Sequence, residues 1–216
     1  MSLATDGFDA DLLSQPIESG TSILLTGEDR DALQSVFSQL VAADDGERSI
    51  VLSTGDGGRA VQRDLNSART GAGSRASVLT CEGPSSGDDI QSIDDISDLT
   101  RLGMDFSTLV ASAQQDSSRF RSGIMLCSTI ASEVDDTRSL YRFLNSNFLT
   151  ELRRGDGIGV CALDTSDDIG ADMGSTIKGL QTSFTGHIAV EKTGRGEATL
   201  TIDGLGDVDG TVDVAL

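Results

Sequence analysis

Residues 20–37 of the chain, GTSILLTGEDRDALQSVF, constrain its fold more than any other segment. A short apolar run at 23–26 leads into a glycine, a polar turn follows, and the apolar spacing then predicts an amphipathic helix over 29–43. Proteins that bind nucleotide phosphates build their phosphate loop on this strand–glycine–helix frame. We therefore expect the position of such a loop to be taken by Gly27, Glu28, Asp29, Arg30 and Asp31.

The residues that give such a loop its chemistry are absent. When G-x-x-x-x-G-K-[ST] is aligned on Gly27, the second glycine falls on Ala32, the lysine on Leu33 and the hydroxyl on Gln34. No ammonium is then available for the β- and γ-phosphates, and no hydroxyl for Mg²⁺. The acidic side chains of the loop also repel a phosphate. We predict a scaffold without ATPase chemistry, with no catalytic residue, metal or cofactor.

The charge composition indicates adaptation to concentrated salt. The chain has 35 acidic residues against 16 basic ones, 27 of the acids are Asp, and Lys178 and Lys192 are its two lysines. Short hydrated carboxylates keep a protein soluble where salt screens their mutual repulsion. The net charge of −19 and the lack of a basic stripe also argue against nucleic acid as a partner.

Cysteine usage and hydropathy predict a cytoplasmic protein. Cys81, Cys127 and Cys161 are far apart in the sequence, form no C-x-x-C pair and lie in or beside apolar runs, as core residues do. No secretory signal or membrane-length apolar stretch is found, so we expect no membrane insertion. Solitary cysteines together with His187 make a poor zinc site, and a solvated acidic face explains the paired aspartates.

Strand-length apolar runs alternate with segments of helical period. Strands are predicted at 22–26, 49–53, 77–81, 123–128 and 157–163, and helices at 29–43, 59–68, 98–114, 133–154 and 169–182. This alternation predicts a three-layer α/β fold, in which a mostly parallel sheet has helices on both faces.

The C-terminal part breaks the alternation. Residues 187–191 and 198–202 alternate apolar and polar side chains around a Gly-rich turn, which predicts an antiparallel hairpin at the sheet edge. We predict loose stretches at 6–20 and 82–98 and a frayed end from Asp207. The predicted organisation is an N-terminal arm at 1–16, one domain at 17–206 and a C-terminal extension at 207–216.

With a first strand entering a glycine loop, four further buried strands and a C-terminal hairpin, the chain resembles the RecA-like ATPases. It is most similar to the KaiC branch and its degenerate haloarchaeal relatives. The segment GTSILLTG at 20–27 resembles that branch's first strand, and GIMLCST at 123–129 resembles its fourth. The resemblance also includes YRFL at 141–144, LRR at 152–154 and GIGV at 157–160.

The chain departs from the family where the resemblance implies catalytic groups. Cys127 stands where the family places a Mg²⁺-organising Asp. After the second strand, where a water-activating Glu is implied, the chain has Asp56 in a Gly-rich turn, and an Asp there is usually a turn former. We therefore expect a pseudo-ATPase. Backbone N–H groups over Gly27–Asp31, at the helix N-terminus, could still bind an anion, so a nucleotide or anion sensor without turnover remains an alternative.

A second alternative is a serine hydrolase. The segment GPSSG at 83–87 matches the G-x-S-x-G nucleophile elbow, and it offers a triad of Ser85, Asp164 and His187 in hydrolase order. Pro84 and the acidic residues after it fit an elbow poorly, so we expect His187 to be an ordinary sheet-edge histidine. The resemblance favours a regulatory or interaction module in signalling or taxis, with unknown protein partners and possible self-association.

Overall fold

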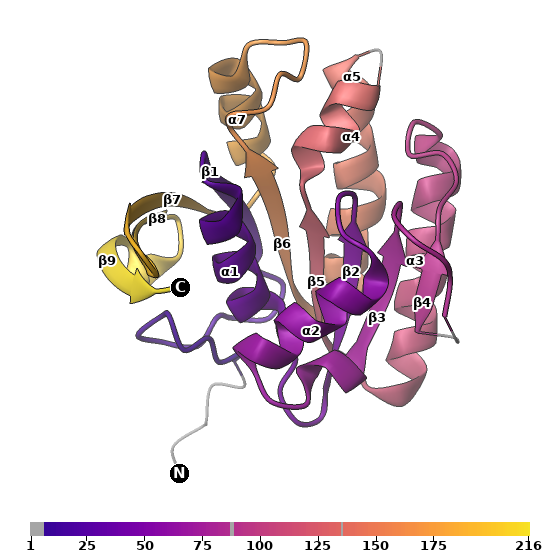
Figure 1. Cartoon of the computed structure of the whole chain (residues 1–216), viewed down its shortest axis with the longest axis horizontal. Helices are drawn as coiled ribbons and strands as arrows, with labels where there is room; N and C mark the ends of the chain where they lie inside the picture. Colours follow the sequence, from indigo (N-terminus) through magenta and orange to yellow (C-terminus); the bar gives the residue numbers. More distant parts are fainter. Residues whose placement is uncertain (1–6, 87–88, 135) are drawn as a thin grey trace.

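The computed structural model describes residues 7–86, 89–134 and 136–216 of the chain. These residues form a nine-stranded sheet in the order β4-β3-β2-β5-β6-β1-β7-β8-β9. The strands from β4 to β7 run parallel, and β8 and β9 are antiparallel. Helices cover both faces of the sheet (Figure 1). The predicted three-layer, mostly parallel α/β fold with its C-terminal antiparallel hairpin is confirmed.

Helices separate successive strands as far as β7, except that β4 follows β3 with no helix between them. The strands are β1 (Ser22–Gly27), β2 (Glu47–Ser53), β3 (Ala76–Thr80), β4 (Ile90–Ser92), β5 (Arg119–Met125), β6 (Asp156–Asp164), β7 (Gly186–Gly194), β8 (Glu197–Asp203) and β9 (Gly210–Ala215). The helices are α1 (Arg30–Val41), α2 (Gly58–Ala68), α3 (Leu99–Asp116), α4 (Cys127–Glu133), α5 (Thr137–Phe143), α6 (Leu149–Arg154) and α7 (Met173–Gln181). Short 3₁₀ turns lie at Ala72–Arg75 (η1) and Gly206–Val208 (η3), and a π-helical turn at Leu144–Phe148 (η2) joins α5 to α6.

Each face of the sheet has its own apolar core. One core lies under α1 and α2 and includes Leu33 and Phe37. The other lies under α3 to α7, where the rings of Phe106 and Phe148 are 5.9 Å apart between centroids. Helix α1 packs directly on the sheet, since a Cβ at Gly123 would lie 2.4 Å from Cζ of Phe37. The residue pattern of the predicted helices produces this two-sided burial.

The helix predictions were right in type and less accurate in extent. The helix expected over 133–154 begins at Thr137, after the separate helix α4, and its middle turn is π-helical. The helix expected over 169–182 begins at Met173, because Asp172 caps it by accepting from the N–H of Ser175 at 2.8 Å. Asp29 and Asp98 likewise cap α1 and α3.

The strand predicted over 123–128 was misplaced. Strand β5 starts four residues earlier, at Arg119, and ends at Met125. Leu126 then adopts φ 63°, in the left-handed region where a bulky residue is rare, and this turns the chain into α4. Charged residues hid the start of the strand, because Arg119 and Arg121 would normally mark a solvent-exposed segment.

Three stretches expected to be loose have structure. Phe8 pairs with Ile17 and both are buried, so the predicted loose arm is attached to the core. Within 82–98, β4 extends the sheet beside β3. The expectation of a frayed C-terminus is wrong, because β9 pairs with β8. The division of the chain at 16 and 206 stays a prediction.

Candidate functional site

The predicted phosphate-loop position is a tight turn at the carboxyl end of β1. The strand ends at Gly27 and α1 begins at Arg30, so Glu28 and Asp29 alone connect them. In G-x-x-x-x-G-K-[ST], the whole stretch between the glycines is loop, and its N–H groups surround a phosphate. Here Arg30 and Asp31 are already helical. The turn is therefore too short to make that cradle.

The carboxylate of Asp29 occupies two of the groups of this turn that could bind an anion. Its Oδ1 accepts from the N–H of Ala32 at 2.9 Å, and its Oδ2 accepts from Nζ of Lys192, on β7, at 2.8 Å. The Lys192 contact, followed by the Ala32 N–H, lowers the pKa of Asp29, and the same pair raises the pKa of Lys192. A helix N-terminus and an ammonium are groups that hold phosphate. Here they hold the chain's own side chain.

Replacing Lys192 with Met should raise the pKa of Asp29, because the strongest cause of its lowering is removed. An NMR titration of the side-chain carboxyl would measure this. Lys178→Met is the matched control, since Lys178 is the chain's other lysine and does not act on Asp29. An unchanged Asp29 titration in Lys192→Met would show that the ion pair is not formed in solution.

A cavity of about 560 Å³ adjoins the turn. It is lined by Thr26, Gly27, Glu28, Asp29, Thr165, Ala189, Val190, Glu191 and Lys192. Three of these residues are acidic and one is basic, and that base is already paired with Asp29. The balance of charge in the cavity therefore disfavours a polyanion.

The residue at the Walker lysine position faces the core. Leu33 is fully buried in the cluster under α1. A Cβ on Gly27 would lie 3.1 Å from the carbonyl oxygen of Val190 and 3.4 Å from Cδ1 of Leu33, so strand, helix and β7 are in close contact here. A side chain at position 33 thus points away from the cavity.

At the carboxyl end of β5, Cys127 stands where the resemblance implies a Mg²⁺-organising Asp. Cys127 is the first residue of α4, is fully buried, and lies close enough to the buried thiol of Cys161, on β6, to affect its pKa. Burial, with a further effect of Cys127, raises the pKa of Cys161 well above its usual value. Both thiols are free cysteines. They are packed core groups, as small apolar side chains would be.

Asp56 acts as a turn residue. Its N–H donates to Oγ of Ser53 at 3.2 Å, and its carbonyl accepts from Ser53 and from Thr80. The neighbouring Gly55 lies under the guanidinium of Arg30, since a Cβ there would be 2.1 Å from its Nη2. The structure thus brings Arg30, at the start of α1, to the loop that follows β2.

The residues of the predicted hydrolase triad are not brought together. Ser85 lies beside β4, where its hydroxyl bonds with that of Ser92 at 2.8 Å. His187 lies on β7, six strands away, which is roughly 29 Å at the usual strand spacing. Asp164 accepts from Ser166 at 2.6 Å. The triad hypothesis is therefore wrong, because the sheet order separates its nucleophile from its base.

His187 is a half-buried structural residue with both ring nitrogens bonded. Nε2 contacts Oγ1 of Thr26 at 2.8 Å, and Nδ1 contacts the amide of Gln181 at 2.9 Å. Desolvation lowers its pKa, and the charge of Asp203 opposes this weakly. The expectation of an ordinary histidine agrees with this geometry.

This pKa shift predicts acid sensitivity. Because the folded pKa is below the unfolded value of about 6.5, the unfolded state binds more protons as pH falls past that value, and stability drops. His187→Gln should flatten the loss of stability between neutral pH and about pH 5, measured by denaturant unfolding across pH. If the stability of the variant falls as steeply with pH as that of the native chain, groups other than His187 cause the acid sensitivity.

The sequence also predicts that the chain has no metal site and does not insert into a membrane. Over residues 7–86, 89–134 and 136–216, His, Cys, Asp and Glu side chains form no group of three or more suited to a metal ion. No helix among the described residues is both long and apolar enough to span a membrane.

Sequence reasoning missed two features of charge. Lys192 was placed in a hairpin turn, yet β7 extends to Gly194 and carries the lysine to Asp29. Glu47 and Arg121 form a buried ion pair at the opposite end of the sheet. The rarity of lysine was the sequence signal for Lys192. The alternation of Arg119 and Arg121 beside an apolar run was the signal for the buried ion pair.

Comparison with known proteins supports the fold. Among solved structures, the chain is similar to the KaiC-like protein PH0186 from the hyperthermophilic archaeon Pyrococcus horikoshii OT3, with a TM-score of 0.61 and 14% identity. The alignment covers 97% of this chain and 99% of that one. No curated protein matches the sequence significantly. Because the identity is low, this likeness establishes the RecA/KaiC-like fold and nothing further.

A family model, described as a family of unknown function (DUF7504), matches residues 20–190. This match begins just before β1 and ends within β7, so it includes the turn at Gly27 and most of the parallel sheet. The chain belongs to the DUF7504 family, and its fold is that of the RecA/KaiC-like proteins.

Proposed function

We propose that this chain is a non-catalytic RecA/KaiC-like ATPase homologue that acts as a regulatory or protein-interaction module. The carboxylate of Asp29 is the observation that carries the proposal. It accepts from both the N–H of Ala32, in the first turn of α1, and the ammonium of Lys192. A nucleotide phosphate would have to displace this carboxylate and then remain beside it.

Two further features support the absence of turnover. Leu33 is fully buried, so no cation reaches the cavity from the lysine position of the motif. Cys127, just after β5, is equally buried and is a thiol where the family places a carboxylate. Phosphoryl transfer depends on cations that neutralise the developing charge, and the described residues around the turn offer Arg30 and the already paired Lys192.

A phosphate-release assay with MgATP in molar KCl tests this proposal. The expected result is release at the background rate. Asp56→Ala serves as the diagnostic variant, because Asp56 is the acid nearest to the position where the family places its water-activating group. Turnover in the native chain that disappears in Asp56→Ala would overturn the proposal.

The alternative is an anion or nucleotide sensor at 27–31, and the cavity beside Lys192 is the observation that favours it. A ligand that binds the folded state alone raises the melting temperature. Thermal shift with ATP, ADP and inorganic phosphate in molar KCl therefore separates the two. We expect no shift, and a saturable shift abolished by Lys192→Met would establish the sensor instead.

We place the protein in the cytoplasm of a halophilic archaeon, in signal transduction or taxis. The excess of Asp over Lys supports the salt-rich setting. Exposed Arg30 and the loops at the strand carboxyl ends form the surface through which we expect protein partners or a second copy to bind. Light scattering after size exclusion, for the native chain and Arg30→Ala, would report self-association through this surface. A single monomeric mass in both would contradict it.

A further inference from the structure

Strand β9 is the outermost strand on one side of the sheet and leaves an edge open (Figure 1). It pairs with β8, and beyond its end the N–H of Leu216 donates to the carbonyl of Gly196 at 2.9 Å. In an antiparallel ladder every second residue bonds to the neighbouring strand, so Thr211, Asp213 and Ala215 direct their backbone groups away from β8. Among the described residues, no strand lies on that side.

This edge lacks the features that usually keep an edge strand from pairing with another chain. β9 has six residues and contains no proline, lysine or bulge. Val212 continues a row of apolar side chains from Val190 on β7 and Leu200 on β8, and it is 36% exposed. By contrast, β4 at the other edge has three residues, and Ser86 pairs with it. A further strand beside β9 would cover Val212 and bond to the open backbone.

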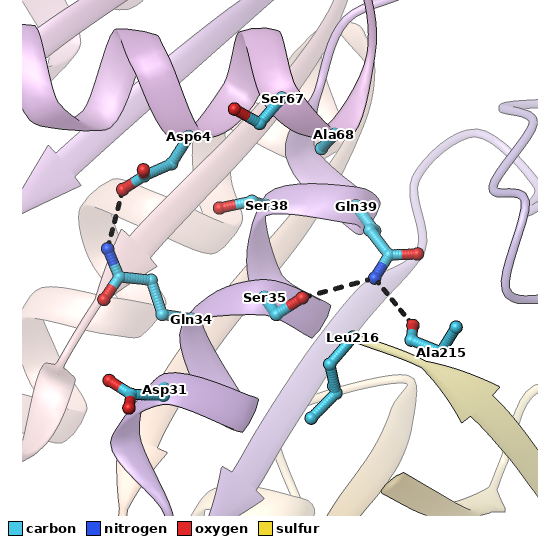
Figure 2. A pocket seen from close by; sticks show the side chains of 10 residues that line it. All are labelled: Asp31, Gln34, Ser35, Ser38, Gln39, Asp64, Ser67, Ala68, Ala215 and Leu216. Carbon is cyan, nitrogen blue, oxygen red and sulfur yellow. Dashed lines mark hydrogen bonds between the residues drawn. The ribbon is translucent and has the colours of Figure 1, made fainter. Parts of the chain in front are cut away.

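One contact limits how another strand can pair here. The side-chain amide of Gln39, on α1, donates to the carbonyl of Ala215 at 3.3 Å (Figure 2). That carbonyl is therefore already used, and the backbone groups of Thr211 and Asp213 remain for a partner strand. Oδ1 of Asp213 accepts from the hydroxyl of Thr199 at 2.6 Å, which leaves its Oδ2 for another donor.

We propose that β9 pairs antiparallel with β9 of a second copy of this chain, with Val212 on the two-fold axis. In this register Thr211 of each copy lies opposite Asp213 of the other, and each such pair exchanges both backbone hydrogen bonds. The hydroxyl of Thr211 donates to the remaining oxygen of Asp213. The two Val212 side chains meet at a non-hydrogen-bonded position, where opposite side chains are closest.

The neighbouring registers are less favourable. With Thr211 opposite its own copy, Asp213 would face Asp209, and like charges directly opposite each other destabilise a strand pair. With Asp213 on the axis, two carboxylates would again face each other, and Thr211 would lie opposite Ala215, whose carbonyl is bonded to Gln39. The chemistry of this edge therefore fits its own copy in one register. The edge does not include Arg30 or the turn at Asp29, so this proposal is independent of the proposed function.

Sedimentation velocity across a range of protein and KCl concentrations tests the proposal. We expect a reversible monomer–dimer equilibrium that strengthens with KCl, because each copy has a net charge of −19 and salt screens the repulsion. Thr211→Pro removes an N–H that bonds to nothing within the sheet, so it should weaken the dimer about tenfold or more. Thr211→Val keeps the N–H and should weaken it about threefold. Arg30→Ala should dimerise as the native chain does.

The variant Val212→Cys tests the register. On the axis the two Cα atoms would lie about 4.5 Å apart, within the range of a disulfide, so oxidised glutathione should give a covalent dimer on a non-reducing gel. Ala215→Cys is the matched control, because it is equally exposed on β9 but its copy would lie roughly 20 Å away. The native chain, which keeps Cys81, should not cross-link. This test also serves if Thr211→Pro does not fold, which circular dichroism would show.

Three outcomes would overturn the proposal. They are a monomer under all conditions, an unchanged dimer in folded Thr211→Pro, and equal cross-linking of Val212→Cys and Ala215→Cys. A dimer that is lost in Arg30→Ala and kept in Thr211→Pro would also overturn it, and would assign self-association to the carboxyl ends of the strands.

Discussion

Glu47→Gln should destabilise the protein by about 3–5 kcal/mol, because it leaves a buried guanidinium without its counter-charge. Arg121 is fully buried on β5, and its Nε donates to Oε2 of Glu47 at 2.6 Å. Its Nη1 donates to the carbonyl of Leu40 at 3.2 Å, and Nη2 is buried with no partner among the described residues. The ring of Phe8 lies 5.5 Å from the same guanidinium.

Loss of Glu47 therefore affects the sheet and the N-terminal segment together. For a chain of this length, each kcal/mol corresponds to roughly 2–4 °C in melting temperature, so a fall of roughly 6–20 °C is expected in thermal unfolding. Asp45→Asn is the control, since its pair with Arg75 is exposed and should be worth less than about 1 kcal/mol.

The double variant Glu47→Gln/Arg121→Met sharpens this test. Removing both charges should recover part of the stability lost in Glu47→Gln, since the penalty comes from the unpaired charge. If Glu47→Gln is no less stable than Asp45→Asn, the buried pair does not have the role inferred from its contacts.

Restoring the Walker lysine, in the variant Leu33→Lys, should destabilise the fold by several kcal/mol and should create no ATP binding. Position 33 is fully buried under α1, so the new ammonium would lie in the apolar core instead of the cavity beside Gly27. Denaturant unfolding measures the first effect and calorimetry with MgATP the second. Leu33→Met keeps the volume of the side chain and should cost less than about 1.5 kcal/mol.

A stable Leu33→Lys variant that bound MgATP would contradict this explanation. It would mean that the turn can open into a loop and that the lysine can reach a phosphate. The motif has lost its backbone shape as well as its lysine, because α1 begins where the phosphate loop should continue.

Much of this fold could be predicted from hydrophobic pattern. Runs such as Ile23 to Leu25 are buried on both faces, and the amphipathic period of α1 matches the core that it covers. Segments were mispredicted where the residue type indicated the opposite of its position in the structure. Arg121 is a buried charge inside a strand, and Leu126 adopts a left-handed conformation that no propensity favours.

The candidate site was predictable in position and not in geometry. The residues at 27–31 identify a strand–helix turn, but sequence alone could not say that Asp29 would cap α1 and meet Lys192 from a distant strand. Contacts between strands that are distant in the sequence, not local pattern, determine this geometry.

Isothermal titration of MgATP into the native chain in molar KCl tests the central claim most directly. If Asp29 fills the anion position, the titration should give only heats of dilution up to about 1 mM nucleotide. Saturable binding in that range, lost in Lys192→Met and kept in Lys178→Met, would show that the turn at Gly27 still receives a nucleotide.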